Sequence, residues 1–275
     1  MELQQKYEKL KEYLKELGSV AVAYSNGVDS TLLLKVAHDV LGENAMAITA
    51  ASGSLPLREK EEAIAFCKKE GIVQVICETK EIEREDYVQN PVNRCYICKN
   101  ELFSTLKKTA EEHGMKYIAE GSNVDDLGDY RPGLVAVKEQ GAKSPLRYAG
   151  LTKDEIRTLS KQLGLPTWEK QAFACLASRF PYGERISNEG LGMVEKAEEV
   201  LMEEGLRQFR VRCHGGNLAR IETDDEGFEK ITTPESRKKI YKAFKEIGFT
   251  YISIDLQGYR MGSMNETLAK DGEKS

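Results

Sequence analysis

The sequence has no long apolar segment, no signal peptide and no excess of basic residues, and each absence excludes a class of protein. No apolar run approaches membrane-spanning length, and the start at residues 1–6 (MELQQK) lacks the features of a signal peptide. We therefore expect a soluble protein that stays in the cytoplasm. The 45 acidic and 40 basic residues give a net charge of −5. That balance argues against a long nucleic-acid interface, since such a surface is usually basic.

The common phosphate-binding and zinc-binding motifs are missing too. The chain contains neither G-x-G-x-x-G nor the long loop with Gly-Lys of a Walker A motif. A zinc site would need a second C-x-x-C or a close histidine pair, whereas His38, His113 and His214 are scattered. The six cysteines, in a chain without an export signal, are expected to be thiols or metal ligands rather than disulfides.

The stretch Val20–Leu34 (VAVAYSNGVDSTLLL) organises the rest of the chain. Its apolar, β-branched first part, through Tyr24, predicts a buried strand. Asn26-Gly27 interrupts the strand, because these residues tolerate positive φ most readily. Asp29-Ser30-Thr31 then opens an amphipathic helix, with acceptor groups near its first N–H groups. A strand, a tight polar loop and a helix N-terminus form an anion site, because several N–H dipoles converge there.

Strands and helices alternate up to about residue 164 and predict an α/β domain with a parallel sheet covered on both faces. The predicted strands are 20–24, 45–50, 74–77 and 117–119. The predicted helices are 2–17, 29–41, 56–70, 96–113 and one from Leu151 with the Thr152–Glu155 spacing of a capping box. Ligands bind such sheets at the carboxyl ends of the strands, where the 25–30 loop, Ser52-Gly53 and Gly121-Ser122 fall.

The remainder of the chain predicts a smaller α+β domain. We expect helices at 188–204 and 234–246, and strands at 208–213, 218–223 and 250–255. The predicted domains are therefore 1–170 and 171–268, followed by a disordered tail at 269–275.

Cys95-Tyr96-Ile97-Cys98 forms a C-x-x-C at the start of a predicted helix. By itself it fits a redox pair, half a zinc site or two cluster ligands. Cys175 is a third candidate, since three cysteines can hold three irons of a [4Fe–4S] cluster and leave the fourth iron open for an exogenous sulfide. The alternative for Cys175 is a small buried hydrophobe, the role that we expect for Cys67, Cys77 and Cys213.

Residues 25–30 (SNGVDS) read Ser-x-Gly-x-Asp-Ser, which resembles the PP-loop (SGGxDS) of ATP pyrophosphatases, with Asn26 in place of the second glycine. Asn can still adopt a left-handed conformation. Several later segments complete the resemblance, in this order: 125–133 (DDLGDYRPG), 144–146 (SPL), 175–179 (CLASR), 181–183 (PYG), 209–212 (FRVR), 219–222 (ARIE) and 258–260 (GYR). Over residues 15–265 the chain resembles the LarE-type ATP-dependent sulfur transferases.

The resemblance implies an adenine-nucleotide-alpha-hydrolase-like domain followed by a substrate domain. It also implies a reaction: adenylation of the carboxylates of pyridinium-3,5-biscarboxylic acid mononucleotide, then their conversion to thiocarboxylates for the nickel-pincer cofactor of lactate racemase. In one branch of the family, the cysteine that matches Cys175 gives up its own sulfur. Another branch has three cysteines and uses a [4Fe–4S] cluster, and Cys95, Cys98 and Cys175 place this chain there.

Individual residues receive roles from the same resemblance. ATP binding is expected at Ser25, Asn26, Gly27, Val28, Asp29, Ser30, Ser52 and Gly121. Asp29 is expected to hold Mg²⁺, with a helix-cap role as the alternative. Substrate anions are expected at Arg179, Arg210 and Arg212; the last two share one face of a strand, and the alternative is that they are merely solvated. Glu198 and Glu222 are expected to hold a metal or to orient the arginines.

The expected partners are the mononucleotide substrate, a sulfide source and further copies of the chain in a homo-oligomer. Three other functions compete with this interpretation. A cluster-dependent tRNA thiolase has the same ligand order, but the acidic charge argues against it. The others are a nucleotide-sensing module without chemistry and an amide-forming ligase, for which no glutaminase signature is present.

Overall fold

The protein consists of two units, each with its own sheet. Its structure is a computed structural model that describes residues 2–128, 132–171 and 174–266. The first unit comprises Met1–Glu81 and Asn93–Phe173, and the second comprises Ile82–Val92 and Ala174–Ser275. The second unit therefore includes residues 82–92, which the sequence analysis assigned to the first domain. The predicted tail at 269–275 lies outside the described residues.

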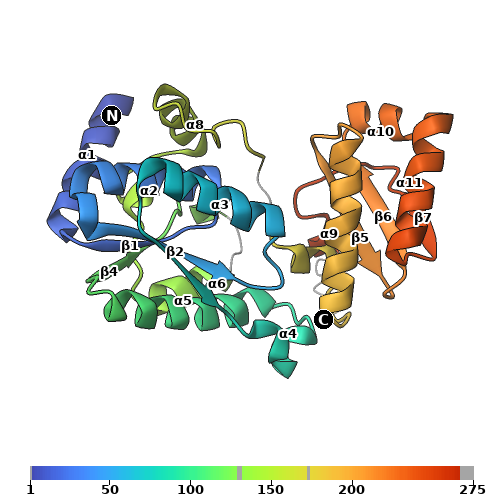
Figure 1. The fold of residues 1–275 in the computed structure, drawn as a ribbon, viewed down its shortest axis with the longest axis horizontal. Helices are drawn as coiled ribbons and strands as arrows, with labels where there is room; N and C mark the ends of the chain where they lie inside the picture. The colour runs from blue at the N-terminus through green and yellow to red at the C-terminus, as the bar shows by residue number, and fades with distance from the viewer. Residues whose placement is uncertain (1, 129–131, 172–173, 267–275) are drawn as a thin grey trace. The chain divides into compact units, whose positions relative to one another are not determined.

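The sheet of the first unit is parallel, as predicted, and has the strand order β3-β2-β1-β4. Its strands are β1 (Val20–Ala23), β2 (Ala45–Ala51), β3 (Gln74–Glu78) and β4 (Tyr117–Ala119). Because β1 lies between β2 and β4, the loop that leaves β1 emerges in the middle of the sheet's carboxyl edge (Figure 1). This fold class was predicted correctly.

Helices cover both faces of this sheet (Figure 1). Their bounds are α1 (Leu3–Leu17), α2 (Val28–Leu41), α3 (Leu57–Glu70), α5 (Arg94–Glu112), α6 (Pro132–Glu139), α7 (Pro145–Ala149) and α8 (Lys153–Gln162). Val20 and Val22 pack with α1, α2, α3 and α8 in one apolar cluster, whereas Ala21 packs with α5 and α6 in another. This alternation along β1 is what a strand buried on both faces requires.

The second unit has the predicted α+β composition. Its elements are α4 (Glu85–Val88), α9 (Asn188–Glu203), β5 (Phe209–His214), β6 (Leu218–Thr223), α10 (Asp225–Ile231), α11 (Pro234–Ile247) and β7 (Tyr251–Ile254). β5 and β6 are antiparallel, while β7 runs parallel to β6. The early segment joins this unit through main-chain bonds, from Ile186 N to Val88 O (2.8 Å) and from Gly183 N to Asn90 O (2.9 Å).

The short helices α4, α6, α7 and α10 were not predicted. Each spans eight residues or fewer, which is too short for a 3.6-residue apolar period to stand out. Within the described residues, no helix combines the length and apolar character that a membrane crossing needs.

Candidate functional site

The loop at residues 25–30 connects β1 to α2 and has the backbone that the sequence predicts. Tyr24 still bonds to the sheet, through its N–H to Ile48 O at 2.9 Å. Asn26 has φ of 58°, in the left-handed region, and α2 begins at Val28 with Gly27 as its N-cap residue. Asn26 thus takes up the conformation for which the family motif uses glycine.

The N-terminus of α2 is open, because no described side chain caps it at Gly27. The hydroxyls of Ser30 and Thr31 donate to Gly27 O at 3.2 and 2.8 Å, and Ser30 Oγ accepts from Ser25 N at 3.4 Å, an amide outside the helix. Side chains cap α8, α9, α10 and α11, whereas α3, α5 and α7, like α2, have no cap bond from a described side chain. An open helix start inside a tight loop attracts an anion.

Gly121, at the end of β4, lies directly against this helix start. A Cβ added there would be 3.0 Å from Ser30 N and 3.1 Å from Asp29 Cβ. Only glycine permits so close an approach. The structure therefore brings together two of the predicted sites, the loop and Gly121, while Ser52 follows β2 at the same edge, with its Oγ 2.9 Å from Ser54 Oγ.

Lys153 belongs to this site although the sequence analysis missed it. Its Nζ forms an ion pair with Asp29 Oδ2, and Asn123 Nδ2 donates to Asp29 Oδ1 at 3.3 Å. Lys153 is the first residue of α8, where a cation opposes the helix dipole. A lysine at this unfavourable position was the sign in the sequence that its charge has another partner. In the structure, that partner is the Asp29 carboxylate.

Cys95 and Cys98 lie in the first turn of α5, as predicted, and both side chains are half-buried thiols. Three positions apart on a helix, they share one face. Gly133 packs on this turn, since a Cβ there would be 3.7 Å from Cys95 Cβ. The role of Cys95 and Cys98 as cluster ligands stays a prediction.

Cys175 is an exposed thiol immediately before the 3₁₀ turn η4 (Leu176–Arg179) of the second unit. Cys67 and Cys213 are buried, and burial raises their thiol pKa values to about 12 and 11, which fits the packing role expected for both. Across residues 2–128, 132–171 and 174–266, no three His, Cys, Asp or Glu side chains form a metal site. The three-cysteine ligand set stays a prediction.

Arg179 is fully buried and bonded to Glu198 through two parallel hydrogen bonds, of 2.8 and 2.9 Å. Its Nη1 donates to Ala174 O at 2.8 Å, so the guanidinium also holds the backbone just before Cys175. Glu198 additionally accepts a bond from Val211 N at 3.0 Å. Arg179 therefore anchors the cysteine segment to the rest of the second unit, while its predicted contact with substrate stays a prediction.

Arg210 and Arg212 share one face of β5 and are only 3% and 5% exposed, so the alternative that they are merely solvated is wrong. Arg212 donates to Glu222 Oε2 through Nε (3.0 Å) and Nη2 (2.6 Å). Arg210 lies over the Tyr259 ring at 5.1 Å. Burial, and then the charge of Arg179, lower the pKa of Arg210 to about 10. An anion beside Arg210 would favour its charged form.

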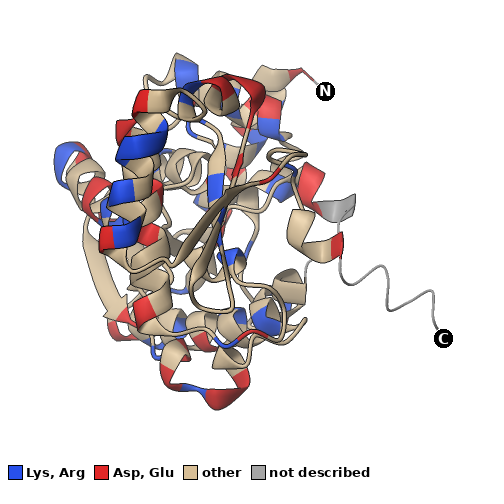
Figure 2. Ribbon diagram, turned by 90° about the vertical axis from the view of Figure 1, so that its right-hand side faces the viewer, with Lys and Arg blue, Asp and Glu red and all other residues tan. Residues whose placement is uncertain are grey.

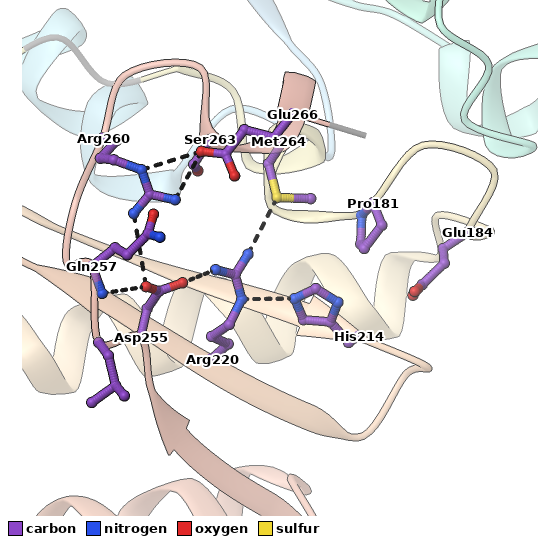
Figure 3. A pocket seen from close by; sticks show the side chains of 11 residues that line it. Pro181, Glu184, His214, Arg220, Asp255, Gln257, Arg260, Ser263, Met264 and Glu266 are labelled. Carbon is purple, nitrogen blue, oxygen red and sulfur yellow. Dashed lines mark hydrogen bonds and ion pairs between the residues drawn. The ribbon is translucent and has the colours of Figure 1, made fainter. Parts of the chain in front are cut away.

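A pocket of about 470 Å³ lies in the second unit next to these arginines (Figure 3). Arg220 crosses it and pairs with Asp255 and with Glu222 Oε1 (3.1 Å), and its Nε donates to His214 Nε2 at 3.0 Å. Because Glu222 also binds Arg212, a continuous set of ion pairs joins the pocket to this one of the predicted substrate arginines. Among the predicted roles for Glu222, the geometry fits orientation of arginines.

The chain is similar in sequence to several known proteins, although no protein-family model matches it. It is 46% identical over 98% of its length to an uncharacterised protein from Synechocystis, all of which is covered. It is 36% identical over 94% of its length, and 92% of the relative's, to the pyridinium-3,5-bisthiocarboxylic acid mononucleotide synthase of Lactiplantibacillus plantarum. A glutamine-hydrolysing GMP synthase from Thermosipho africanus is 26% identical over 72% of the chain and 43% of its own length.

Gly121→Ala tests the close approach at the helix start. The new Cβ would meet backbone at 3.0 Å, so the loop must shift. We expect binding of MgATP, the ligand that the resemblance implies, to weaken about 10- to 100-fold in calorimetric titrations. Gly192→Ala in α9 is the control, because a Cβ there has open space within 4 Å. Equal affinities for Gly121→Ala and the wild type would contradict the assignment.

His214 predicts a pH dependence of the second unit's stability. Burial, and then the Arg220 charge, lower the pKa of His214 below its ordinary 6.5, against the opposing effect of Glu184. Folding therefore disfavours protonation, so this stability contribution is present above about pH 6.5 and is lost as the pH falls below it. His214→Gln keeps an acceptor for Arg220. In urea unfolding at pH 5.5 and 7.5, we expect this variant to show a smaller loss of stability than the wild type. His113→Gln is the control, and an unchanged pH slope in His214→Gln would refute the prediction.

Proposed function

The chain belongs to the family of the pyridinium-3,5-bisthiocarboxylic acid mononucleotide synthase, ATP-dependent sulfur transferases with the PP-loop pyrophosphatase fold, and from this we propose its reaction. It adenylates the carboxylates of pyridinium-3,5-biscarboxylic acid mononucleotide and converts them to thiocarboxylates, a step in making the nickel-pincer cofactor. One observation carries the proposal. The 36% identity to the synthase extends over 94% of the chain and so over both units.

The open start of α2 supports the first half-reaction. A carboxylate is a poor electrophile, so its oxygen must first attack the α-phosphorus of ATP, which releases pyrophosphate and leaves an acyl-adenylate. The uncapped first amides of α2 are donors of the kind that would stabilise the charge that builds up on the departing pyrophosphate. Lys153, next to Asp29, adds a positive charge to this edge. The Asp29 carboxylate is the hard oxygen donor that Mg²⁺ prefers, and Mg²⁺ held there would share the negative charge of the phosphates.

The thiols of Cys95, Cys98 and Cys175 support the second half-reaction. All three are at least partly accessible, as is Cys77 on the edge strand β3, whereas Cys67 and Cys213 are buried. Thiolate sulfur suits iron–sulfur ligation, and a [4Fe–4S] cluster held by these residues would have one iron open to bind the external sulfide that serves as the nucleophile. In the alternative route, Cys175 gives its own sulfur. Either way, sulfur attacks the carbonyl carbon and AMP leaves with the carboxylate oxygen.

The buried arginines suit the substrate, which carries carboxylates and a phosphate. Arg210 and Arg212 lie side by side on β5, and Glu222 fixes the orientation of Arg212. Planar guanidinium groups recognise carboxylate and phosphate oxygens in pairs. Figure 2 shows acidic and basic residues interspersed over the visible helices, a surface that suits a small anion better than tRNA. The proposal includes an external sulfide source, a homo-oligomeric assembly and a cytoplasmic location.

The reaction is tested by supplying the mononucleotide and MgATP to the purified protein under anaerobic conditions. We expect pyrophosphate release that requires the mononucleotide, together with a thiocarboxylate product identified by mass spectrometry. Cys175→Ser should still release pyrophosphate but lose the sulfur product, because adenylation precedes sulfur attack. Cys77→Ser is the control, with a thiol that is half-buried on the edge strand β3. Pyrophosphate release that requires tRNA instead would favour the competing thiolase function.

The sulfur route is tested by the iron and acid-labile sulfide content of anaerobically purified protein. We expect about four iron atoms per chain, as three-cysteine [4Fe–4S] ligation implies, and loss of iron in Cys95→Ala. Absence of iron, with Cys175 one sulfur atom lighter after reaction, would instead establish the sacrificial route.

A further inference from the structure

Asn26 is the one departure of the loop from the family motif, and both polar atoms of its side-chain amide form hydrogen bonds. It is 2% exposed, and its amide nitrogen donates to Glu59 Oε2 (3.2 Å) and Glu62 Oε2 (2.9 Å). Its carbonyl oxygen accepts a bond from the Tyr24 hydroxyl at 3.1 Å. An amide offers two donor hydrogens and one acceptor oxygen, so each has a partner.

The two carboxylates that hold Asn26 need a cation between them. Glu59 and Glu62 are three positions apart on α3, and Lys170 Nζ lies 2.6 and 2.7 Å from the same two oxygen atoms that bind Asn26. Burial opposes ionisation of Glu62, but Lys170 lowers its pKa on balance. Arg58 is farther away, at 3.6 Å from the remaining oxygen of each. Lys170 is therefore the principal counter-charge.

Lys170 is itself fixed in place. Arg157 of α8 donates to Trp168 O at 2.6 Å and to Lys170 O at 2.8 Å. Lys161 lies over the Trp168 ring at 4.4 Å. The ammonium group is thus presented to α3 from an anchored segment, and its side chain is only 14% exposed.

We propose that Glu59, Glu62 and Lys170 form a latch that holds Asn26 in the left-handed conformation the loop needs to bind phosphate. Glycine adopts this conformation at no steric cost, whereas Asn, which tolerates it better than most residues, still meets some steric cost there. The latch offsets that cost by fixing the Asn26 side chain. Lys170 is a positioning residue, since it touches the carboxylates and not the nucleotide. This inference rests on the proposed function for the identity of the ligand, ATP.

The test is a double-mutant cycle between Lys170→Met and Asn26→Gly, read by MgATP titration calorimetry. Lys170→Met should weaken MgATP binding about threefold to tenfold, the effect of loosening one or two of the hydrogen bonds that hold Asn26. In the Asn26→Gly background, the same change should have less than about a twofold effect, because glycine needs no latch. Lys170→Arg should retain wild-type affinity. Equal effects of Lys170→Met in both backgrounds would overturn the latch.

Lys35→Met is the matched control, since Lys35 also joins two carboxylates, Asp39 (2.7 Å) and Glu70 (3.2 Å), but does not touch the loop. Its MgATP affinity should equal that of the wild type. If Lys170→Met does not fold, Glu62→Gln replaces it, because that side chain is 45% exposed. Its effect should be about threefold and should likewise vanish with Asn26→Gly; an effect that persists there would overturn the proposal.

Hydrogen exchange without nucleotide separates failure of the latch from failure of the proposed function. Peptides that contain residues 24–31 should exchange faster in Lys170→Met than in the wild type. The double variant Lys170→Met with Asn26→Gly should exchange no faster than Asn26→Gly alone. This pattern in a protein that does not bind MgATP would retain the latch and reject the function. Unchanged exchange in Lys170→Met, with normal MgATP binding, would reject the latch alone.

Discussion

The start of α2 is the constraint on which the first unit depends. Its first amides stay available because, within the described part of the chain, no side chain caps the helix at Gly27. Keeping such a helix end open and in place requires support from several elements. β4 reaches it through Gly121, α8 provides Lys153, and α3 holds Asn26. Each support belongs to a different segment of sequence, so the site exists only once the sheet has formed.

Buried charge organises the second unit in a comparable way. Arg179–Glu198 and Arg212–Glu222 are nearly completely buried pairs. Such pairs rarely add stability over apolar side chains of similar size, because desolvation of both charges offsets their attraction. Their value here is orientation. One pair fixes the backbone beside Cys175, and the other fixes a guanidinium that the proposed reaction uses for substrate.

Local patterns were enough to predict the strands, the longer helices and the left-handed Asn26, because each follows from neighbours in sequence. They could not show which carboxylates Lys153 and Lys170 meet, because Asp29 and Glu59 are 124 and 111 positions away. A lone lysine carries no periodicity, and its meaning comes from the carboxylate that the fold places beside it. For the same reason, Arg179 could be chosen as important from the family resemblance while its bond to Glu198 remained invisible.

The segment 82–92 has a consequence for how this protein is made. It leaves the first unit after Glu81, bonds with residues 183 and 186, and returns at Asn93 just before the C-x-x-C turn. During translation, Val88 and Asn90 are synthesised almost a hundred residues before their main-chain partners emerge from the ribosome. Neither unit can therefore be produced from one uninterrupted stretch of the gene.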